Sequence, residues 1–167
     1  YKLGIDLPGE KRGMIPNAQF YDKAYRGSWN GLTVISIAIG QGEVTATPLQ
    51  IANLGATIAN RGYFVTPHVV KEIEGEPMDS VFSEKRYTKV DKSHYDEVAQ
   101  GMRMAVLGGT CRTANMPDIE ICGKTGTAEN HGKDHSAFMG FAPLNNPKIA
   151  VAVYVENGGW GATYGVP

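Results

Sequence analysis

Cysteine is scarce in this sequence: only Cys111 and Cys122 occur among 167 residues. Two cysteines make no disulfide framework, so the class of small secreted domains stabilised by several disulfides is excluded. One disulfide could join the pair, but we favour two free, partly buried thiols. Metal ligands are sparse too. His131 and His135 have a spacing that could hold a metal on a helix, yet Gly132 and its polar neighbours predict a loop, so we expect no metal site.

The sequence also lacks a surplus of charge and long apolar runs. It has 16 basic and 17 acidic residues, which leaves no basic footprint for nucleic acid, and we expect no such partner. No stretch approaches the roughly 18 apolar residues of a membrane helix, and the start, YKLGIDLPGE, does not have the pattern of a signal peptide. Without an initiator Met, the chain is expected to be an internal piece of a longer protein. Its 42% apolar and 20% charged residues are typical of one globular domain.

The first part of the chain, residues 1–115, is predicted to be mainly helical and irregular. Turn-forming residues dominate 1–31, and the apolar run LTVISIAIGQG after them could be a buried strand or a short buried helix. The clearest helix starts at Pro48, where Thr47 suits the N-cap and Gln50 completes a capping box. We expect this helix to be buried on most sides, with Leu54 in the core.

Residues 75–92 are predicted to be a surface excursion. A second helix is predicted to follow it, from about 93 to 107, with Gly108 and Gly109 as its stop signal. Its apolar side is formed by Tyr95, Val98, Met102, Ala105 and Val106. The last part, residues 116–167, holds three strand-like runs, IEICGKTGTAEN, HSAFMGFAPL and KIAVAVYVENGG, separated by short turns. Short connections favour an antiparallel meander, in which we expect IAVAVYV to be the most buried strand. The fold class is therefore α+β, with helices followed by a three-stranded antiparallel meander.

The first of these strands carries a lysine and two threonines among glycines. A glycine inside a strand often marks the close approach of a ligand, so a substrate could lie against Gly126 as an added strand. Lys124 could offer a cation and Thr125 a hydroxyl to a substrate carboxylate, and the Thr127 N–H could point at a developing oxyanion. Lys-Thr-Gly alone is common by chance, and a polar strand end is the alternative interpretation.

Four segments carry a pattern that extends beyond local structure: GIDLPGE (4–10), IGQGEVTATPLQIANLGATIANRG (39–62), GKTGTAE (123–129) and FMGFAP (138–143). Together they resemble class B penicillin-binding proteins, the D,D-transpeptidases that cross-link peptidoglycan. The Lys-Thr-Gly within the third segment is one of the signature motifs of penicillin-binding proteins and serine β-lactamases. The similarity is closest to the elongation-type penicillin-binding protein 2, and ENGGWGATYG (156–165) looks like that subgroup's end of the last strand.

The family's nucleophile motif is missing from this sequence. None of its serines has lysine three residues later, and the Ser-x-Asn match at 28–30 follows GIDLPGE instead of preceding it, so we interpret it as coincidence. We therefore expect a partial penicillin-binding protein/serine β-lactamase-like transpeptidase fold. It would be the C-terminal portion of the domain, would stop before the family's final helix, and would need the rest of the domain to acylate.

The resemblance implies a role for each matching residue. Lys124 would support proton transfer and the substrate carboxylate, Thr125 and Gly126 would bind substrate, and the Thr127 N–H would complete the oxyanion hole. The segment Gly40, Gln41 and Gly42 would shape the groove. No metal or organic cofactor is implied. The implied partners are peptidoglycan stem peptides, β-lactams, membrane proteins of cell elongation and the rest of the transpeptidase domain. The implied location is the bacterial cell membrane, with the domain on its outer side.

Other functions remain open at this point. A D,D-carboxypeptidase, a β-lactamase or a β-lactam sensor would share the fold, although TATPLQIANLGATIANRG favours the transpeptidase. A non-catalytic interaction module that has lost the serine, and a small α+β protein unrelated to cell walls, belong to different classes. The reading frame upstream of Tyr1 discriminates among them, because Ser-x-x-Lys followed by Ser-x-Asn would establish an enzyme.

The missing nucleophile yields a direct prediction. The isolated 167-residue chain is expected to form no covalent adduct with a fluorescent penicillin, because no serine is paired with a lysine in the required motif. Intact-protein mass spectrometry after incubation measures this, with a penicillin-binding protein that contains Ser-x-x-Lys as the positive control. A stable adduct on any serine of this chain would contradict the prediction.

Overall fold

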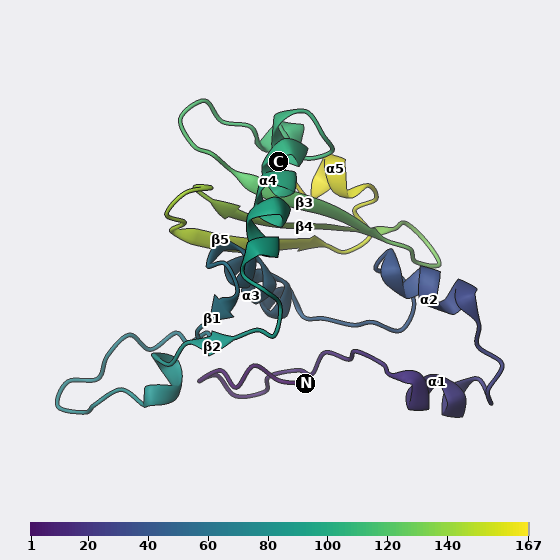
Figure 1. Ribbon diagram of the computed structural model, residues 1–167, viewed down its shortest axis with the longest axis horizontal. Helices are drawn as coiled ribbons and strands as arrows, with labels where there is room; N and C mark the ends of the chain where they lie inside the picture. The colour runs from purple at the N-terminus through teal and green to yellow at the C-terminus, as the bar shows by residue number, and fades with distance from the viewer. Residues whose placement is uncertain (167) are drawn as a thin grey trace.

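The structure is a computed structural model that describes residues 1–166. Its centre is a three-stranded sheet with α3 (Pro48–Ala59) on one face and the short helix α5 (Gly161–Tyr164) on the other, while α4 (Ser93–Leu107) crosses beside β3 (Figure 1). The strands are β3 (Cys122–Ala128), β4 (His135–Ala142) and β5 (Ile149–Val155). They pair antiparallel in the order β3-β4-β5, which confirms the predicted meander.

The strand β5 differs from the prediction. Its sequence IAVAVYV was expected to be the most buried, but Ile149 is 59% exposed and Val151 and Val153 are also exposed. The most buried strand is β4, which has a neighbour on each side. The apolar composition of β5 therefore misled the prediction, because burial of a strand depends on its place in the sheet.

The helix α3 (Pro48–Ala59) begins as predicted. The Thr47 side chain accepts from the Gln50 N–H, and the Gln50 side chain accepts from the Thr47 N–H, so the capping box is present. Leu54 is 53% exposed, so its predicted place in the core is wrong. One face of α3 packs on the sheet, at Gly55 near Met139, and Leu54 lies off that face.

The helix α4 (Ser93–Leu107) ends at Gly108, as predicted. Tyr95, Met102 and Val106 are buried, but Val98 is exposed and does not belong to the core. Two buried clusters result. The first comprises Ile58, Ala59, Tyr95, Ala99, Met102, Cys122, Phe141 and Leu144. The second comprises Val106, Cys111 and Phe138.

The cysteines are free and buried, one in each cluster. The prediction of two free thiols is therefore confirmed, and both are more deeply buried than expected. Burial raises the pKa of the Cys122 thiol to about 11, so this thiol is neutral at physiological pH and packs as a small apolar side chain.

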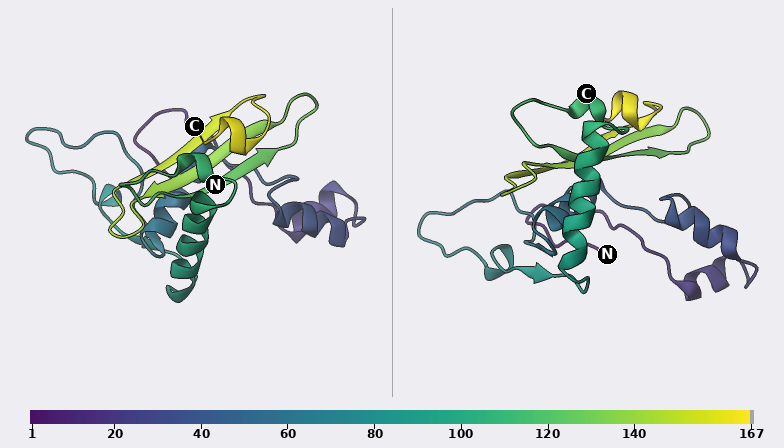
Figure 2. Two further views of the ribbon diagram at one scale, coloured as in Figure 1. Left: turned by 90° about the horizontal axis from the view of Figure 1, so that it is seen from above. Right: turned by 45° about the horizontal axis from the view of Figure 1, so that its top comes forward.

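The helices α1 (Ala18–Ala24) and α2 (Gly31–Ala38) lie on a part of the chain that extends away from the sheet (Figure 2). The run LTVISIAIGQG is thus mostly helical, and it is not buried, since Leu32 is 74% exposed. The two carboxylates of the motif GIDLPGE fix its position. Asp6 accepts from the N–H groups of Val69 and Val70, and Glu10 accepts from the N–H groups of Leu3 and Gly4.

The remaining elements are short. They are β1 (Tyr63–Phe64) paired with β2 (Arg86–Tyr87), and the 3-10 helices η1 (Ser80–Phe82) and η2 (Arg112–Ala114). The predicted surface excursion at 75–92 contains η1 and β2. In the part of the chain that the structure describes, no helix has the length and apolarity needed to cross a membrane.

A pair of substitutions on α3 tests which of its faces is buried. Ile58→Ala should lower the free energy of unfolding by about 2–5 kcal/mol, because it leaves a cavity in the first cluster. Leu54→Ala should change it by less than about 0.5 kcal/mol, because that side chain is half exposed. Urea titrations measure both. Equal losses in the two variants would show that α3 is buried on more than one face.

Candidate functional site

The predicted site residues Lys124, Thr125, Gly126 and Thr127 all lie on β3, which pairs with β4 along one edge. Within residues 1–166 no strand pairs with the other edge of β3. An unpaired strand edge presents backbone N–H and C=O groups that another extended chain can use. The four residues are therefore placed where a peptide could bind as an added strand.

Two side-chain hydrogen bonds show which backbone groups face this open edge. The Gln41 side-chain amide donates to the Thr127 carbonyl, at 3.2 Å, and the Lys124 ammonium donates to the Thr125 carbonyl. In an antiparallel sheet the N–H and C=O of one residue point to the same edge. The N–H groups of Thr125 and Thr127 therefore also point away from β4, toward a ligand lying along the edge.

The side chains of Lys124 and Thr125 lie in different environments. Lys124 is exposed, whereas Thr125 is only 9% exposed and its hydroxyl lies 2.8 Å from the Thr110 hydroxyl. A hydroxyl has one hydrogen to donate and two lone pairs, so this bond leaves Thr125 with capacity for a second partner. Thr110 was not identified from the sequence, where it follows the glycines that end α4.

The helix α5 holds the end of β3. The Gly161 N–H donates to the Thr127 side-chain oxygen at 3.1 Å, and a Cβ on Gly161 would overlap the carbonyl oxygen of Gly126. The interpretation of 156–165 as the end of the last strand is therefore wrong. Strand β5 ends at Val155, and the glycines that follow let a helix turn back against β3.

The segment Gly40, Gln41 and Gly42 lies beside β3, although about 80 residues separate them in sequence. Its backbone follows α2 with φ angles of 82° at Gly40 and 76° at Gly42, which favour glycine. A groove of about 510 Å³ separates the segment from the sheet. Its lining includes Ile39, Gly40, Val44, Ile51, Gly126 and Thr127. Of the predicted groove-shaping residues, Gly40 thus lines the groove and Gln41 binds the predicted substrate-binding strand, whereas Gly42 is not among the lining residues.

Glu43, next to this segment, is bound by two tyrosines of the α1 region that sequence reasoning missed. Its carboxylate accepts from the Tyr21 hydroxyl at 2.9 Å and from the Tyr25 hydroxyl. These two bonds, that of Tyr25 first, lower the pKa of the Glu43 carboxyl. Burial and then the bond to Glu43 raise the pKa of Tyr21 to about 12. Glu43 is therefore a carboxylate, and both tyrosines are neutral donors, at physiological pH.

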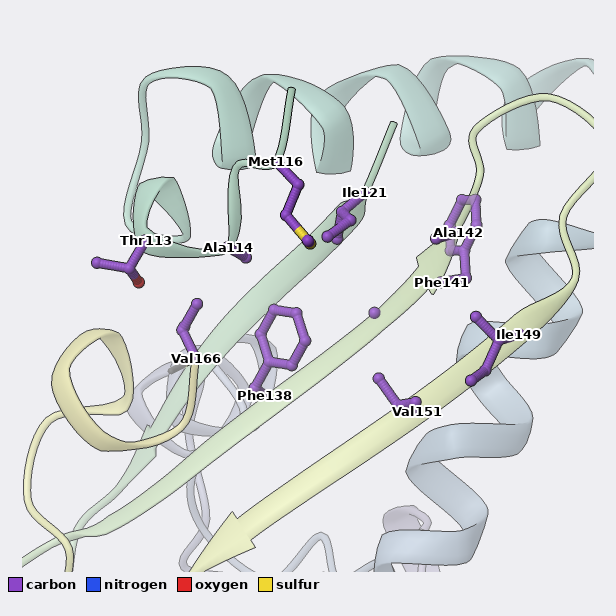
Figure 3. A pocket seen from close by; sticks show the side chains of 11 residues that line it. Thr113, Ala114, Met116, Ile121, Phe138, Phe141, Ala142, Ile149, Val151 and Val166 are labelled. Carbon is purple, nitrogen blue, oxygen red and sulfur yellow. The ribbon is translucent and has the colours of Figure 1, made fainter. Parts of the chain in front are cut away.

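The two histidines considered as metal ligands, and a second pocket, lie outside the groups described above. His131 lies in the β3–β4 turn, and the His135 ring accepts from the Asn157 N–H. Within residues 1–166, no group of three or more His, Cys, Asp or Glu side chains is arranged to hold a metal ion. A pocket of about 350 Å³ on the opposite face of the sheet is lined mainly by apolar side chains, such as Met116, Ile121 and Phe138 (Figure 3).

Comparisons with known proteins cover nearly the whole chain. Residues 1–166 match the family described as the penicillin binding protein transpeptidase domain. Peptidoglycan D,D-transpeptidase MrdA of Acinetobacter baumannii is 37% identical, over 97% of this chain and 27% of the relative. The protein of the same name in Haemophilus influenzae is 32% identical, over 98% of this chain and 29% of the relative. The chain thus spans less than a third of the length of these relatives.

Two solved structures are similar over the same range. PBP2 of Pseudomonas aeruginosa, in complex with WCK 5153, has a TM-score of 0.80 and 39% identity, over 95% of this chain and 35% of that chain. A complex between PBP2 and MreC from Helicobacter pylori has a TM-score of 0.81 and 29% identity, over 97% of this chain and 30% of that chain.

The close contact of α5 with β3 yields a prediction. Gly161→Ala should lower the melting temperature by several degrees, because its Cβ would overlap the Gly126 carbonyl and push α5 off the strand. Gly31→Ala is a matched control, since a Cβ there meets nothing within 4 Å. Differential scanning calorimetry of both variants measures the effect. Equal melting temperatures would show that α5 does not pack on β3 in this way.

Proposed function

Because the chain belongs to the penicillin-binding protein transpeptidase family, we propose that it is part of a peptidoglycan D,D-transpeptidase. This enzyme would cross-link stem peptides through a serine acyl-enzyme and bind β-lactams. The observation that supports this function best is the open edge of β3. It places the Lys124 cation, the Thr125 hydroxyl and two backbone N–H groups along one line where an extended peptide can lie.

The proposed reaction needs a serine from a part of the enzyme outside this chain. The serine oxygen attacks the carbonyl carbon between the two D-Ala residues of a stem peptide, and a neighbouring lysine takes the hydroxyl proton. The tetrahedral oxyanion collapses, the terminal D-Ala leaves with a proton on its amine, and an ester to serine remains. The amine of a second stem peptide then attacks this ester and releases the serine.

Each residue of β3 would have one role in these steps. The Thr127 N–H faces the open edge, where it can donate to the oxyanion without reorganising. The Lys124 ammonium supports proton transfer and attracts the C-terminal carboxylate of the substrate, which Thr125 also binds. A Cβ on Gly126 would meet only Ala137, at 3.4 Å, so packing within this chain does not require glycine there. Gly126 would instead keep the strand free of a side chain where the peptide approaches.

The partners and the location follow from the same proposal. We infer that the enzyme acts at the bacterial cell membrane, with this domain on the outer side where peptidoglycan lies. A relative from Helicobacter pylori is described in complex with MreC, which supports membrane proteins of cell elongation as partners. The chain itself requires no metal or organic cofactor in this mechanism.

The proposal is tested by three substitutions in the longer enzyme. Lys124→Ala should slow acylation by a fluorescent penicillin most, by about a hundredfold, since it removes a charge at the carboxylate. Thr125→Val should slow it about tenfold, because it deletes one hydrogen bond to a charged group. Thr127→Ala should have the smallest effect, because alanine keeps the backbone N–H and removes only the side-chain bond to the Gly161 N–H.

Second-order acylation rates of variants with matched melting temperatures measure this order. Lys133→Ala, in the exposed turn between β3 and β4, is the control for the loss of a lysine and should react like the wild type. Equal rates for the wild type and Lys124→Ala would mean that the strand end carries no chemistry and the proposed function is wrong.

A further inference from the structure

Residues 14–45 form an excursion that leaves the body of the protein and returns to the same point. The backbones of Met14 and Thr45 bridge its base, with N···O distances of 2.8 and 2.9 Å, and α1 and α2 lie beyond it (Figure 1). In the described chain, a single hydrogen bond joins the excursion beyond this base to the body. It is the bond from the Gln41 amide to the Thr127 carbonyl on β3.

The segment that carries Gln41 does not fix its own conformation. Glycine lies on each side of Gln41, and glycine pays the largest conformational entropy when it is held in one state. The backbone bond from the Gln41 N–H to the Ser36 carbonyl, at 3.0 Å, ties the segment to the end of α2. After Gly42 the chain is fixed at Thr45 by the bridge to Met14, and Glu43 gives an anchor closer to Gln41.

Glu43 and the two tyrosines supply that anchor. Tyr21 and Tyr25 are four residues apart on one side of α1 and the turn that ends it, and their rings stack at 5.9 Å. Tyr21 is also buried and packs on Trp29, at 5.8 Å between ring centres. The two hydroxyls are thus held in place, and each donates to a different oxygen of Glu43 in a charge-assisted bond.

We propose that Tyr21 and Tyr25 act through Glu43 as positioning residues that hold Gln41 on the Thr127 carbonyl. This inference rests on the proposed function, because it gives the Gln41 bond a task in acylation. The Thr127 C=O and N–H point to the same edge of β3. Holding the carbonyl therefore fixes the direction of the N–H that donates to the oxyanion.

A purely structural role for the tyrosines would give a different result. If they only stabilised α1, their loss would lower the melting temperature and would affect the site independently of Gln41. If they position Gln41, their loss should have no further effect once Gln41 has been removed. Coupling between the two changes in a double-mutant cycle separates these cases.

The test uses the longer enzyme and a saturating fluorescent penicillin. Tyr21→Phe with Tyr25→Phe should slow the first-order acylation step about tenfold, the effect of losing one well-oriented hydrogen-bond donor to a charge, with little change in penicillin affinity. Gln41→Ala should cause a similar loss, and the triple variant should be no slower than Gln41→Ala alone. Tyr63→Phe with Tyr87→Phe is the matched control. It removes two tyrosine hydroxyls from a ring pair outside residues 14–45, leaves Glu43 and its partners untouched, and should react like the wild type.

Backbone hydrogen exchange provides a readout that needs no activity. Exchange in residues 40–46 and 127–130 should become faster in the Tyr21→Phe, Tyr25→Phe variant and stay unchanged in the Tyr63→Phe, Tyr87→Phe control. Additive rate losses, wild-type acylation in the tyrosine variant, or unchanged exchange at both places would each overturn the positioning role. A wild-type enzyme that is not acylated would overturn the proposed function instead, and the exchange result would then decide the positioning role by itself.

Discussion

The site depends on one constraint: among the described residues, β3 pairs with another strand along a single edge, so its other edge must be held straight by contacts of another kind. Three groups supply them while β4 pairs along the inner edge: Thr110 and Gly161 bind the side chains of Thr125 and Thr127, and Gln41 binds the outer edge. A strand held in this way can present N–H groups to a ligand without first having to be ordered.

Close packing around β3 relies on residues that have no side chain. The Phe138 ring of the second cluster lies so close to Gly123 and Gly140 that a Cβ on Gly140 would be 2.7 Å from the ring. Gly161 similarly lets the backbone of α5 approach Gly126. Ordering glycine at these places costs conformational entropy, but it allows close contact with the Phe138 ring or the Gly126 backbone. These contacts set the position of the strand on which the proposed chemistry depends.

Among the exposed apolar side chains are Leu32 and Ile35 on α2 and Ile149 and Val151 on β5. Exposed apolar surface of this kind is typical of a region that packs against another part of a protein. It is consistent with the proposed enzyme, whose serine lies in a part outside this chain. The chain spans less than a third of the length of the curated relatives described above.

The sequence by itself determined the features that depend on neighbours along the chain. The capping box at Thr47 and Gln50, the glycine stop after α4, the short turns of the meander and the place of Lys124 on its first strand are all local, and all were predicted correctly. Only the tertiary structure decided which faces are covered: Leu54 is exposed, β5 is an edge strand, and the run before Gly40 is an exposed helix. The hydrophobic pattern shows which side chains are apolar, but it does not show which of them another helix or strand covers. The contacts of Thr125 with Thr110, Thr127 with Gly161 and Glu43 with the tyrosines could not be predicted for the same reason, because residues separated along the chain meet only once the sheet and helices have packed.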